Sequence, residues 1–195
     1  MSDTKSLAGQ ILIAMPGMGD PRFERSLVFL CVHSENGAMG IIVNKTAPLM
    51  FFSDLVDQLK IAPQKEGAKV SESILNMPIL FGGPVEQFRG FVLHSKDYFT
   101  KNTSLSINDD VALTATVEIL QAIASGKGPA KLSLALGYSG WVAGQLENEI
   151  QHNGWLQCPA DDDLLFGPNL EGKYLRALKK IGVDPMMLSA DVGHA

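Results

Sequence analysis

The residue best placed to act as a nucleophile is Ser139, in the glycine-rich segment 137–140 between a strand pattern and a helix pattern. The nucleophile of an α/β-hydrolase occupies such a position, and the aspartates 161–163 followed by His194 give the Ser…Asp…His order of that fold. However, the hydrolase turn needs a small residue two positions after the serine, where this chain has Trp141. His194 is also the penultimate residue, a poor place to hold a base within about 3 Å of a hydroxyl. The pattern therefore disfavours a hydrolase.

Two glycine-containing loops suggest phosphate binding. Gly17-Met18-Gly19 follows a strand pattern, but the third glycine of a dinucleotide fingerprint would fall at Arg22, and Pro21 interrupts the helix start. In Gly82-Gly83-Pro84, free backbone N–H groups would be able to hold an anion. Loop and turn geometry explains both segments better than a cofactor does.

The histidines and cysteines show no metal-ligand spacing. The four histidines include no i, i+4 pair, and Cys31 and Cys158 form no CxxC motif. The aspartates 161–163 lack the spaced ligands and the glycine of an EF-hand loop. We therefore predict no metal, no cofactor, and two reduced buried thiols rather than a disulfide.

The main candidate binding surface is one face of a helix predicted to begin at Trp141 and to end at Gly154. At about 100° per residue, Val142, Leu146 and Ile150 form a buried stripe. The other face combines an indole ring, two amides and an imidazole, carried by Trp141, Gln145, Asn148 and His152. A tryptophan ring contributes most to packing energy when other groups cover it. We therefore expect Trp141 to contact residues 16–21 or 82–84. The neighbouring motifs add six candidate site residues, which are Asp20, His33, Gly82, Gly83, Ser139 and Glu147.

The remaining elements predict one α+β domain over residues 1–195, with loose tails at 1–6 and 189–195. Asn36-Gly37 predicts a two-residue hairpin turn between strands 26–33 and 38–44, which places His33 opposite Gly40 and Cys31 opposite Ile42. Further strands are expected at 9–15, 77–81, 88–94, 104–107, 132–136 and 155–158. Helices are expected at 54–60, 109–124, 141–153 and 173–181, giving about four flanking helices.

Composition and charge exclude some classes of function. The formal net charge is −5, which disfavours a broad nucleic-acid-binding surface. Hydrophobic residues make up 46% of the chain. A local basic group lies near the C-terminus, comprising Lys173, Arg176, Lys179 and Lys180, and is interpreted as a solvated helix face. No signal peptide is visible, and no run approaches the roughly 18 apolar residues that a membrane span needs. The expected location is cytoplasmic.

Several glycine- and tryptophan-containing segments run in order along nearly the whole chain. They are residues 9–16, residues 20–23, His33, Gly37-Ala38-Met39-Gly40, Asn44, Gly82-Gly83-Pro84-Val85, Gly137-Tyr138-Ser139-Gly140-Trp141, Gly144-Gln145-Leu146-Glu147, Glu149-Ile150 and Trp155-Leu156. These segments resemble the bacterial YqgE/AlgH family. The resemblance implies a single α+β domain with a mostly antiparallel, branched β-sheet curled into a barrel-like shape, and a cytosolic location. It implies no established activity, cofactor or catalytic residue, although a role in transcriptional regulation has been attached to some members.

Three functional hypotheses follow. The favoured one is a non-enzymatic binding or regulatory module, monomeric or weakly oligomeric, that acts through a protein or small-molecule partner. An enzyme would need a site built from the glycine loops with His33, Glu147 or Ser139. A direct DNA-binding regulator would need the basic C-terminal helix beside other basic side chains.

Overall fold

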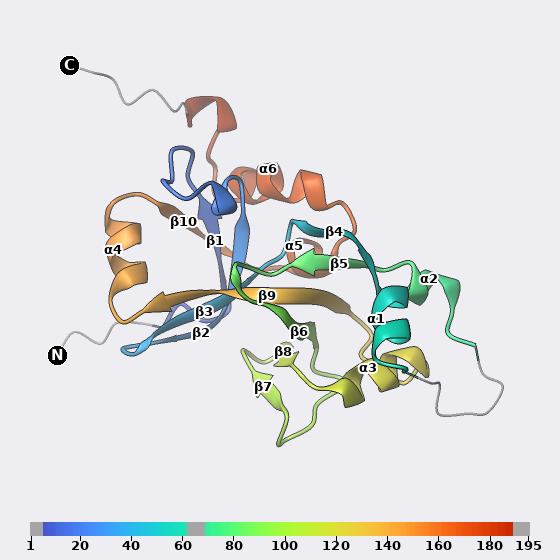
Figure 1. Ribbon diagram of the computed structural model, residues 1–195. Coiled ribbons are helices and arrows are strands. Elements are labelled where there is room, and N and C mark those ends of the chain that lie inside the picture. Colours follow the sequence, from blue (N-terminus) through green and yellow to red (C-terminus); the bar gives the residue numbers. More distant parts are fainter. Residues whose placement is uncertain (1–5, 62–68, 189–195) are drawn as a thin grey trace, which may run out of the picture.

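The computed structural model describes residues 6–61 and 69–188 of the chain. Over these residues it contains ten β-strands, six α-helices and two short 3₁₀ helices (Figure 1). The strands are β1 (Gln10–Ala14), β2 (Leu27–Ser34), β3 (Gly37–Ile42), β4 (Thr46–Phe51), β5 (Pro78–Phe81), β6 (Val85–Ser95), β7 (Ser104–Ser106), β8 (Val111–Thr114), β9 (Leu132–Val142) and β10 (Trp155–Pro159). The helices are α1 (Phe52–Gln58), α2 (Glu72–Leu75), α3 (Val117–Ala124), α4 (Gln145–Gln151), α5 (Asp162–Phe166) and α6 (Leu170–Lys180), with the 3₁₀ helices at Pro21–Phe23 and Pro185–Met187.

One branched sheet contains all ten strands. Its main path is β10-β1-β2-β3-β9-β6-β8-β7, while β4 and β5 form a side branch that joins β9. Every pairing is antiparallel except that of β5 with β9. The predicted α+β domain with a branched, mostly antiparallel and curled sheet is confirmed.

The long strand β9 is the branch point. Its first half pairs with β6 on one side and with β5 on the other, and its last four residues pair with β3. Gly137 lies between these halves with φ +73°, a left-handed conformation that glycine adopts without strain. A single strand thereby serves two parts of the sheet.

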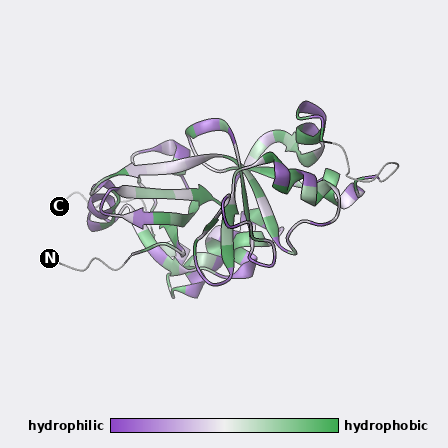
Figure 2. Ribbon diagram, turned by 90° about the horizontal axis from the view of Figure 1, so that it is seen from below, coloured by the Kyte–Doolittle hydropathy of each residue, from purple (hydrophilic) through white to green (hydrophobic). Residues whose placement is uncertain are grey.

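Three hydrophobic clusters form the core. In β1, Ile11 and Ile13 pack with α5 and α6, whereas Leu12 and Ala14 pack with Trp141, Leu146 and Trp155 on the opposite face. The third cluster packs α1 and α3 against β5, β6 and β9. Figure 2 shows hydrophobic stretches along the strands and hydrophilic residues on turns and outer helix faces. The strands β1 and β2 are thus covered on both faces.

The hairpin of β2 and β3 forms, but its predicted register is wrong. Ser34 pairs with Gly37, so Glu35 and Asn36 form the loop, and His33 lies opposite Ala38 rather than Gly40. The register shifts between Leu30, which pairs with Gly40, and Val32. This bulge inserts an extra residue in β2. A register counted outward from the turn does not include such a residue.

The predicted helix over residues 109–124 is half wrong. Val111–Thr114 is the strand β8, whose four residues are buried between β6 and β7, and only Val117–Ala124 is helical. The helix predicted at 54–60 is found at Phe52–Gln58, two residues earlier, and Leu59 after it is 47% exposed. The structure also has two helices beyond the predicted four, α2 and α5.

The last helix buries a lysine instead of presenting it. Lys173 in α6 is 3% exposed, and its Nζ donates hydrogen bonds to the carbonyls of Val43 (3.0 Å) and Leu165 (3.4 Å). Burial lowers the pKa of its ammonium to about 8. Tyr174 and Leu178 are buried as predicted, but Leu175 is 45% exposed. Both thiols, Cys31 and Cys158, are buried and unpaired, as predicted.

We predict that Lys173 makes stability rise with pH. Between about pH 8, where the folded state releases the proton, and about pH 10.4, where the unfolded chain does, the unfolded state binds more protons. Lys173 should therefore contribute a rise in unfolding free energy of a few kcal/mol over this window, on the order of 1.4 kcal/mol per unit of pKa difference. The raised pKa values of Cys31, Cys158 and Tyr174 act in the opposite direction, so the contribution is read as the difference from a variant without the ammonium. Urea unfolding across the window should show this component in the wild type and in the exposed control Lys179→Met, and not in Lys173→Met. An equal rise in Lys173→Met would contradict it.

Candidate functional site

A cleft of about 770 Å³ lies between the β1–β2 loop, the start of β6, the end of β9 and α4. We call it the Trp cleft, because both tryptophans of the chain line it. Its lining comprises Met15, Pro16, Gly17, Met18, Gly19, Asp20, Arg22, Phe23, Pro84, Val85, Gly140, Trp141, Gln145, Asn148, Glu149, His152, Asn153, Gly154 and Trp155. Its volume falls within the range of sites for small molecules.

Three aromatic rings form the floor. Trp141 and Trp155 meet edge to face at 5.8 Å between ring centroids, and Phe23 lies 6.5 Å from Trp141 and 5.6 Å from Trp155. Trp141 is 6% and Trp155 3% exposed. Such contacts add to the hydrophobic burial of the rings and fix their orientations, so the floor is rigid.

Glu149 holds the two indoles together. Its Oε2 accepts hydrogen bonds from Trp141 Nε1 and Trp155 Nε1, both at 2.8 Å, and its Oε1 accepts one from Gln145 Nε2 at 2.9 Å. A buried indole N–H requires an acceptor, and an ionised carboxylate is a strong one. Because both oxygens are engaged, this carboxylate is a structural acceptor and not a free base.

The β1–β2 loop forms one wall. The backbone N–H of Met15 donates to Gly154 O (3.0 Å), which ties the loop to the end of α4. Asp20 caps the 3₁₀ helix and forms an ion pair with Arg22 at 2.6 Å. The hydrogen bond from Arg22 holds the pKa of the Asp20 carboxyl below its usual range. Asp20 thus shapes the loop and stays ionised.

The rim on α4 carries the polar groups. Gln145 Oε1 accepts from Val142 N–H (3.1 Å), so this side chain closes the start of the helix. His152 Nδ1 donates to Asn148 O at 2.8 Å, so Nε2 is the ring nitrogen that remains for a ligand. Within residues 6–61 and 69–188, the Asn148 side-chain amide has no hydrogen-bond partner and is exposed. Asn148 and His152 are therefore the groups available to a ligand.

The structure brings the four predicted surface residues together but corrects the helix that carries them. The chain does not turn at residues 137–140, because β9 continues to Val142 and α4 begins at Gln145. Side chains alternate along a strand, so Trp141 is buried and Val142 is 72% exposed, the reverse of the prediction. Leu146 is buried as predicted. Trp141 also packs in one cluster with Met18 of the predicted loop.

His33 and Glu147 form a pair outside the cleft. Leu7 N–H donates to His33 Nδ1 (2.9 Å), so the ring carries its proton on Nε2, which donates to Glu147 Oε1 at 2.7 Å. Backbone hydrogen bonding at the start of α4 and the bond from His33 lower the pKa of Glu147. The pair joins the segment before β1, the end of β2 and α4.

The other predicted motif residues have structural roles. Ser139 is fully buried, and its Oγ donates only a long hydrogen bond to Gly82 O (3.4 Å), so it is not a nucleophile. Gly82 N–H donates to Leu136 O (2.8 Å) and is therefore not free to hold an anion, and Gly83 lies against the backbone of Tyr138. His194 lies outside the described residues.

The basic C-terminal residues do not form a free patch. Lys173 is buried, Arg176 pairs with Asp161 and Asp163, and Lys180 pairs with Asp161 (2.7 Å). Of the four basic residues, Lys179 is the one that stays exposed without a side-chain partner within the described residues. In the described part of the chain, no three acidic, histidine or cysteine side chains cluster as metal ligands, and no helix is long and apolar enough to cross a membrane.

The fold defines the class of protein, an α+β domain built on a half-barrel sheet with β9 at its branch point. The solution structure of AlgH from Pseudomonas aeruginosa matches it with a TM-score of 0.77 and 37% identity, covering 100% of this chain and 99% of that one. A model of the AlgH-like family (DUF179) matches residues 11–186, and the chain belongs to this family.

Other relatives agree with this assignment. A UPF0301 protein of Bradyrhizobium diazoefficiens is 58% identical over 189 residues, 97% of this chain and 88% of the relative. One of Methylobacterium nodulans is 57% identical, over 97% and 90% of the two chains. A crystal structure from Corynebacterium diphtheriae, only 17% identical with a TM-score of 0.68 over 96% of this chain and 92% of that one, shares the fold. None of these descriptions names an activity, ligand or partner.

Sequence reasoning missed the residues at the centre of the cleft. Glu149, Phe23 and Trp155 were not candidates, although they hold and pack Trp141. A usable signal was present, because Gln145 and Glu149 are four residues apart and share one helix face. The link to Trp155 depends on β10 returning beside β1, which no local pattern reveals.

We predict that Glu149→Gln destabilises the protein by about 1–3 kcal/mol. The neutral amide weakens the charge-assisted bonds to both indoles, and its NH₂ group meets donors on Trp141, Trp155 or Gln145. Chemical unfolding measures the loss of unfolding free energy. A shifted tryptophan emission spectrum would show that the change lies in the cleft. Glu72→Gln, an exposed substitution in α2, should leave both unchanged. Wild-type stability in Glu149→Gln would show that the carboxylate does not organise the floor.

Proposed function

We propose that the protein is a non-enzymatic binding module whose Trp cleft takes a small molecule or short partner segment that presents amide-type hydrogen-bonding groups. The observation that carries this proposal is the exposed Asn148 amide, which has no partner within the described ranges, at the rim of a cleft with an aromatic floor. An amide both donates and accepts, so it matches another amide or a peptide group. The acceptor Nε2 of His152 adds a second contact.

The groups of the cleft favour binding over catalysis. Glu149 accepts three hydrogen bonds, and Asp20 is held by Arg22, so neither is poised to move a proton. Ser139 and the His33–Glu147 pair are not among the residues that line the cleft. His152 is the titratable side chain of the rim that stays available, so general acid–base catalysis in the cleft would depend on it without Asp20 or Glu149 as a second group. The alternative of an enzyme built from the glycine loops therefore has less support.

A regulatory role exerted through a partner is consistent with this cleft. Binding that changes the contacts of the β1–β2 loop or of α4 would alter the surface that the module presents. We propose that any effect on transcription is indirect, because Lys173 of α6 is buried and Arg176 and Lys180 are paired with aspartates, which leaves Lys179 as the exposed, unpaired member of this basic group within the described residues. The two buried thiols support a cytoplasmic location, and we propose a monomer or weak homo-oligomer.

The two tryptophans provide a built-in reporter for the test. Both lie in the cleft, so intrinsic fluorescence reports ligand binding there without a label. A panel of N-acetylated, C-terminally amidated dipeptides and nucleobases should contain members that change the emission of the wild-type protein. Asn148→Ala should weaken these members about fivefold, the effect of losing roughly 1 kcal/mol of hydrogen bonding, with unfolding free energy within about 0.5 kcal/mol of wild type.

The matched control is Gln151→Ala. Gln151 is exposed on the same helix and does not line the cleft, so its substitution should leave every affinity unchanged. If hits bind the wild type and Asn148→Ala equally, or if the two variants lose the same affinity, the cleft is not their binding site. An absence of any hit in the panel would also count against an amide-type ligand.

A further inference from the structure

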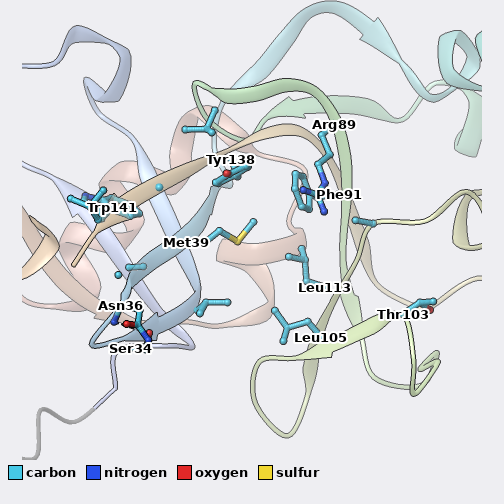
Figure 3. A pocket seen from close by; sticks show the side chains of 17 residues that line it. Ser34, Asn36, Met39, Arg89, Phe91, Thr103, Leu105, Leu113, Tyr138 and Trp141 are labelled. Carbon is cyan, nitrogen blue, oxygen red and sulfur yellow. Dashed lines mark hydrogen bonds between the residues drawn. The ribbon is translucent and has the colours of Figure 1, made fainter. Parts of the chain in front are cut away.

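A second hollow lies on the concave side of the sheet, between the β2–β3 hairpin and the strands β6, β7 and β8 (Figure 3). We call it the half-barrel groove. Its volume is about 720 Å³, and its apolar lining includes Val32, Met39, Phe91, Leu105, Leu113 and Tyr138. The β2–β3 hairpin joins the sheet at the end of β9, whereas β6 pairs along the first part of β9 and carries β8 on its other side, and the groove lies between them.

Several apolar side chains that line the groove are partly exposed to solvent. Val32 is 38%, Val85 36% and Leu105 43% exposed, and Val142 at one end is 72% exposed. Soluble proteins rarely leave such side chains gathered in one concave surface unless the surface binds something. The volume also fits a small-molecule site. An apolar body is therefore the first requirement for an occupant.

A single positive charge defines the second requirement. Among the described residues that line the groove, Arg89 is the only charged one. Its guanidinium lies 5.2 Å from the ring centroid of Phe91, and Tyr138 meets Phe91 edge to face at 5.8 Å. Figure 3 shows Arg89, Phe91 and Tyr138 together at one end, with Leu113 and Leu105 further along.

The existing partner of Arg89 leaves it able to bind an anion. One N–H donates to Glu86 at 3.2 Å, and both side chains are about half exposed, so the pair contributes little stability. Guanidinium has five N–H donors in a planar fork that matches a carboxylate. The stack on Phe91 holds this fork at the end of the groove.

We infer that the half-barrel groove binds a small amphipathic monocarboxylate, with its carboxylate on Arg89 and its hydrocarbon chain along Met39, Leu113 and Leu105. The positive charge of Arg89 disfavours the binding of a cationic amphiphile with the same chain. The inference goes beyond the proposed function, because it concerns a different surface and a different class of ligand. The two sites share only the segment of β9 around Trp141 and the neighbouring Val85.

Titration calorimetry on the full-length protein tests the inference with decanoate and with decyltrimethylammonium as probes, both below micelle formation. Decanoate should bind the wild type saturably, and the cation should bind at least tenfold more weakly. Arg89→Gln should weaken decanoate about tenfold, because it removes a charge-assisted contact. Leu105→Asn should weaken it by a similar factor by interrupting the apolar path.

Two matched variants serve as controls, and thermal unfolding verifies that all four variants fold. Glu86→Gln keeps the guanidinium and frees it from its partner, so decanoate affinity should stay equal or increase. Leu175→Asn changes a leucine of similar exposure, 45%, on α6 and should have no effect. The inference is overturned if decanoate does not bind, if both amphiphiles bind equally, or if folded Arg89→Gln and Leu105→Asn keep wild-type affinity.

Discussion

The fold depends on a backbone-to-backbone crossing where the β5–β6 connection passes β9. A Cβ atom added to Gly83 would lie 2.2 Å from the carbonyl carbon of Tyr138, and one added to Gly82 would lie 2.3 Å from Gly137 O. The constraint is mutual, since a Cβ on Gly137 would lie 2.4 Å from Gly83 O. Real Cβ contacts are essentially never that short, so only glycine permits the crossing. Positive φ angles at Gly83 (+152°) and Gly137 (+73°) reinforce the requirement.

The crossing explains how one strand builds two surfaces. Before Gly137, β9 pairs with β6 and β5 and closes the core that α1 and α3 cover; after it, the strand pairs with β3. Tyr138 is the last residue of β9 that pairs with β6, the four residues after it pair with β3, and the half-barrel groove lies between the hairpin and β6. On the other side, alternation along the strand directs Trp141 toward Trp155, Phe23 and Glu149. Cleft and groove are both consequences of the same bend.

Much of this fold was predictable from the sequence because strand signals here are strong. Double-sided apolar strands, the hairpin and the short edge strand β7 follow from composition and turn residues, and the resemblance to a known family supplied the branched sheet. Errors arose where a local pattern fits two structures. Leu113, Val117 and Leu120 have helical spacing, yet Leu113 belongs to β8, because strand pairing with β6 outweighs periodicity. Likewise, Gly140 suggested a turn where pairing with β3 keeps the strand extended.

The candidate site was predictable only as a set of residues. Gln145, Asn148 and His152 share a helix face that periodicity reveals, but the aromatic floor depends on contacts between β9, β10 and the β1–β2 loop. Contacts between segments that lie far apart in the sequence leave no pattern within any one segment. Gly82 and Gly83, which suggested anion binding, are required by the close backbone crossing, and Ser139, which suggested a nucleophile, is buried beside it with its Oγ 3.4 Å from Gly82 O.

We propose that the glycine crossing sets the geometry of the sheet and hence of the Trp cleft. The most direct measurement compares Gly83→Ala with Gly90→Ala by unfolding free energy and by near-ultraviolet circular dichroism, which reports the two cleft tryptophans. A Cβ atom added to Gly90 would meet no atom within 4 Å, and its φ is not positive, so this substitution should cost less than about 1 kcal/mol and leave the spectrum intact. Gly83→Ala should lose more than about 3 kcal/mol and change the tryptophan signal. Wild-type stability and an unchanged spectrum in Gly83→Ala would contradict the account.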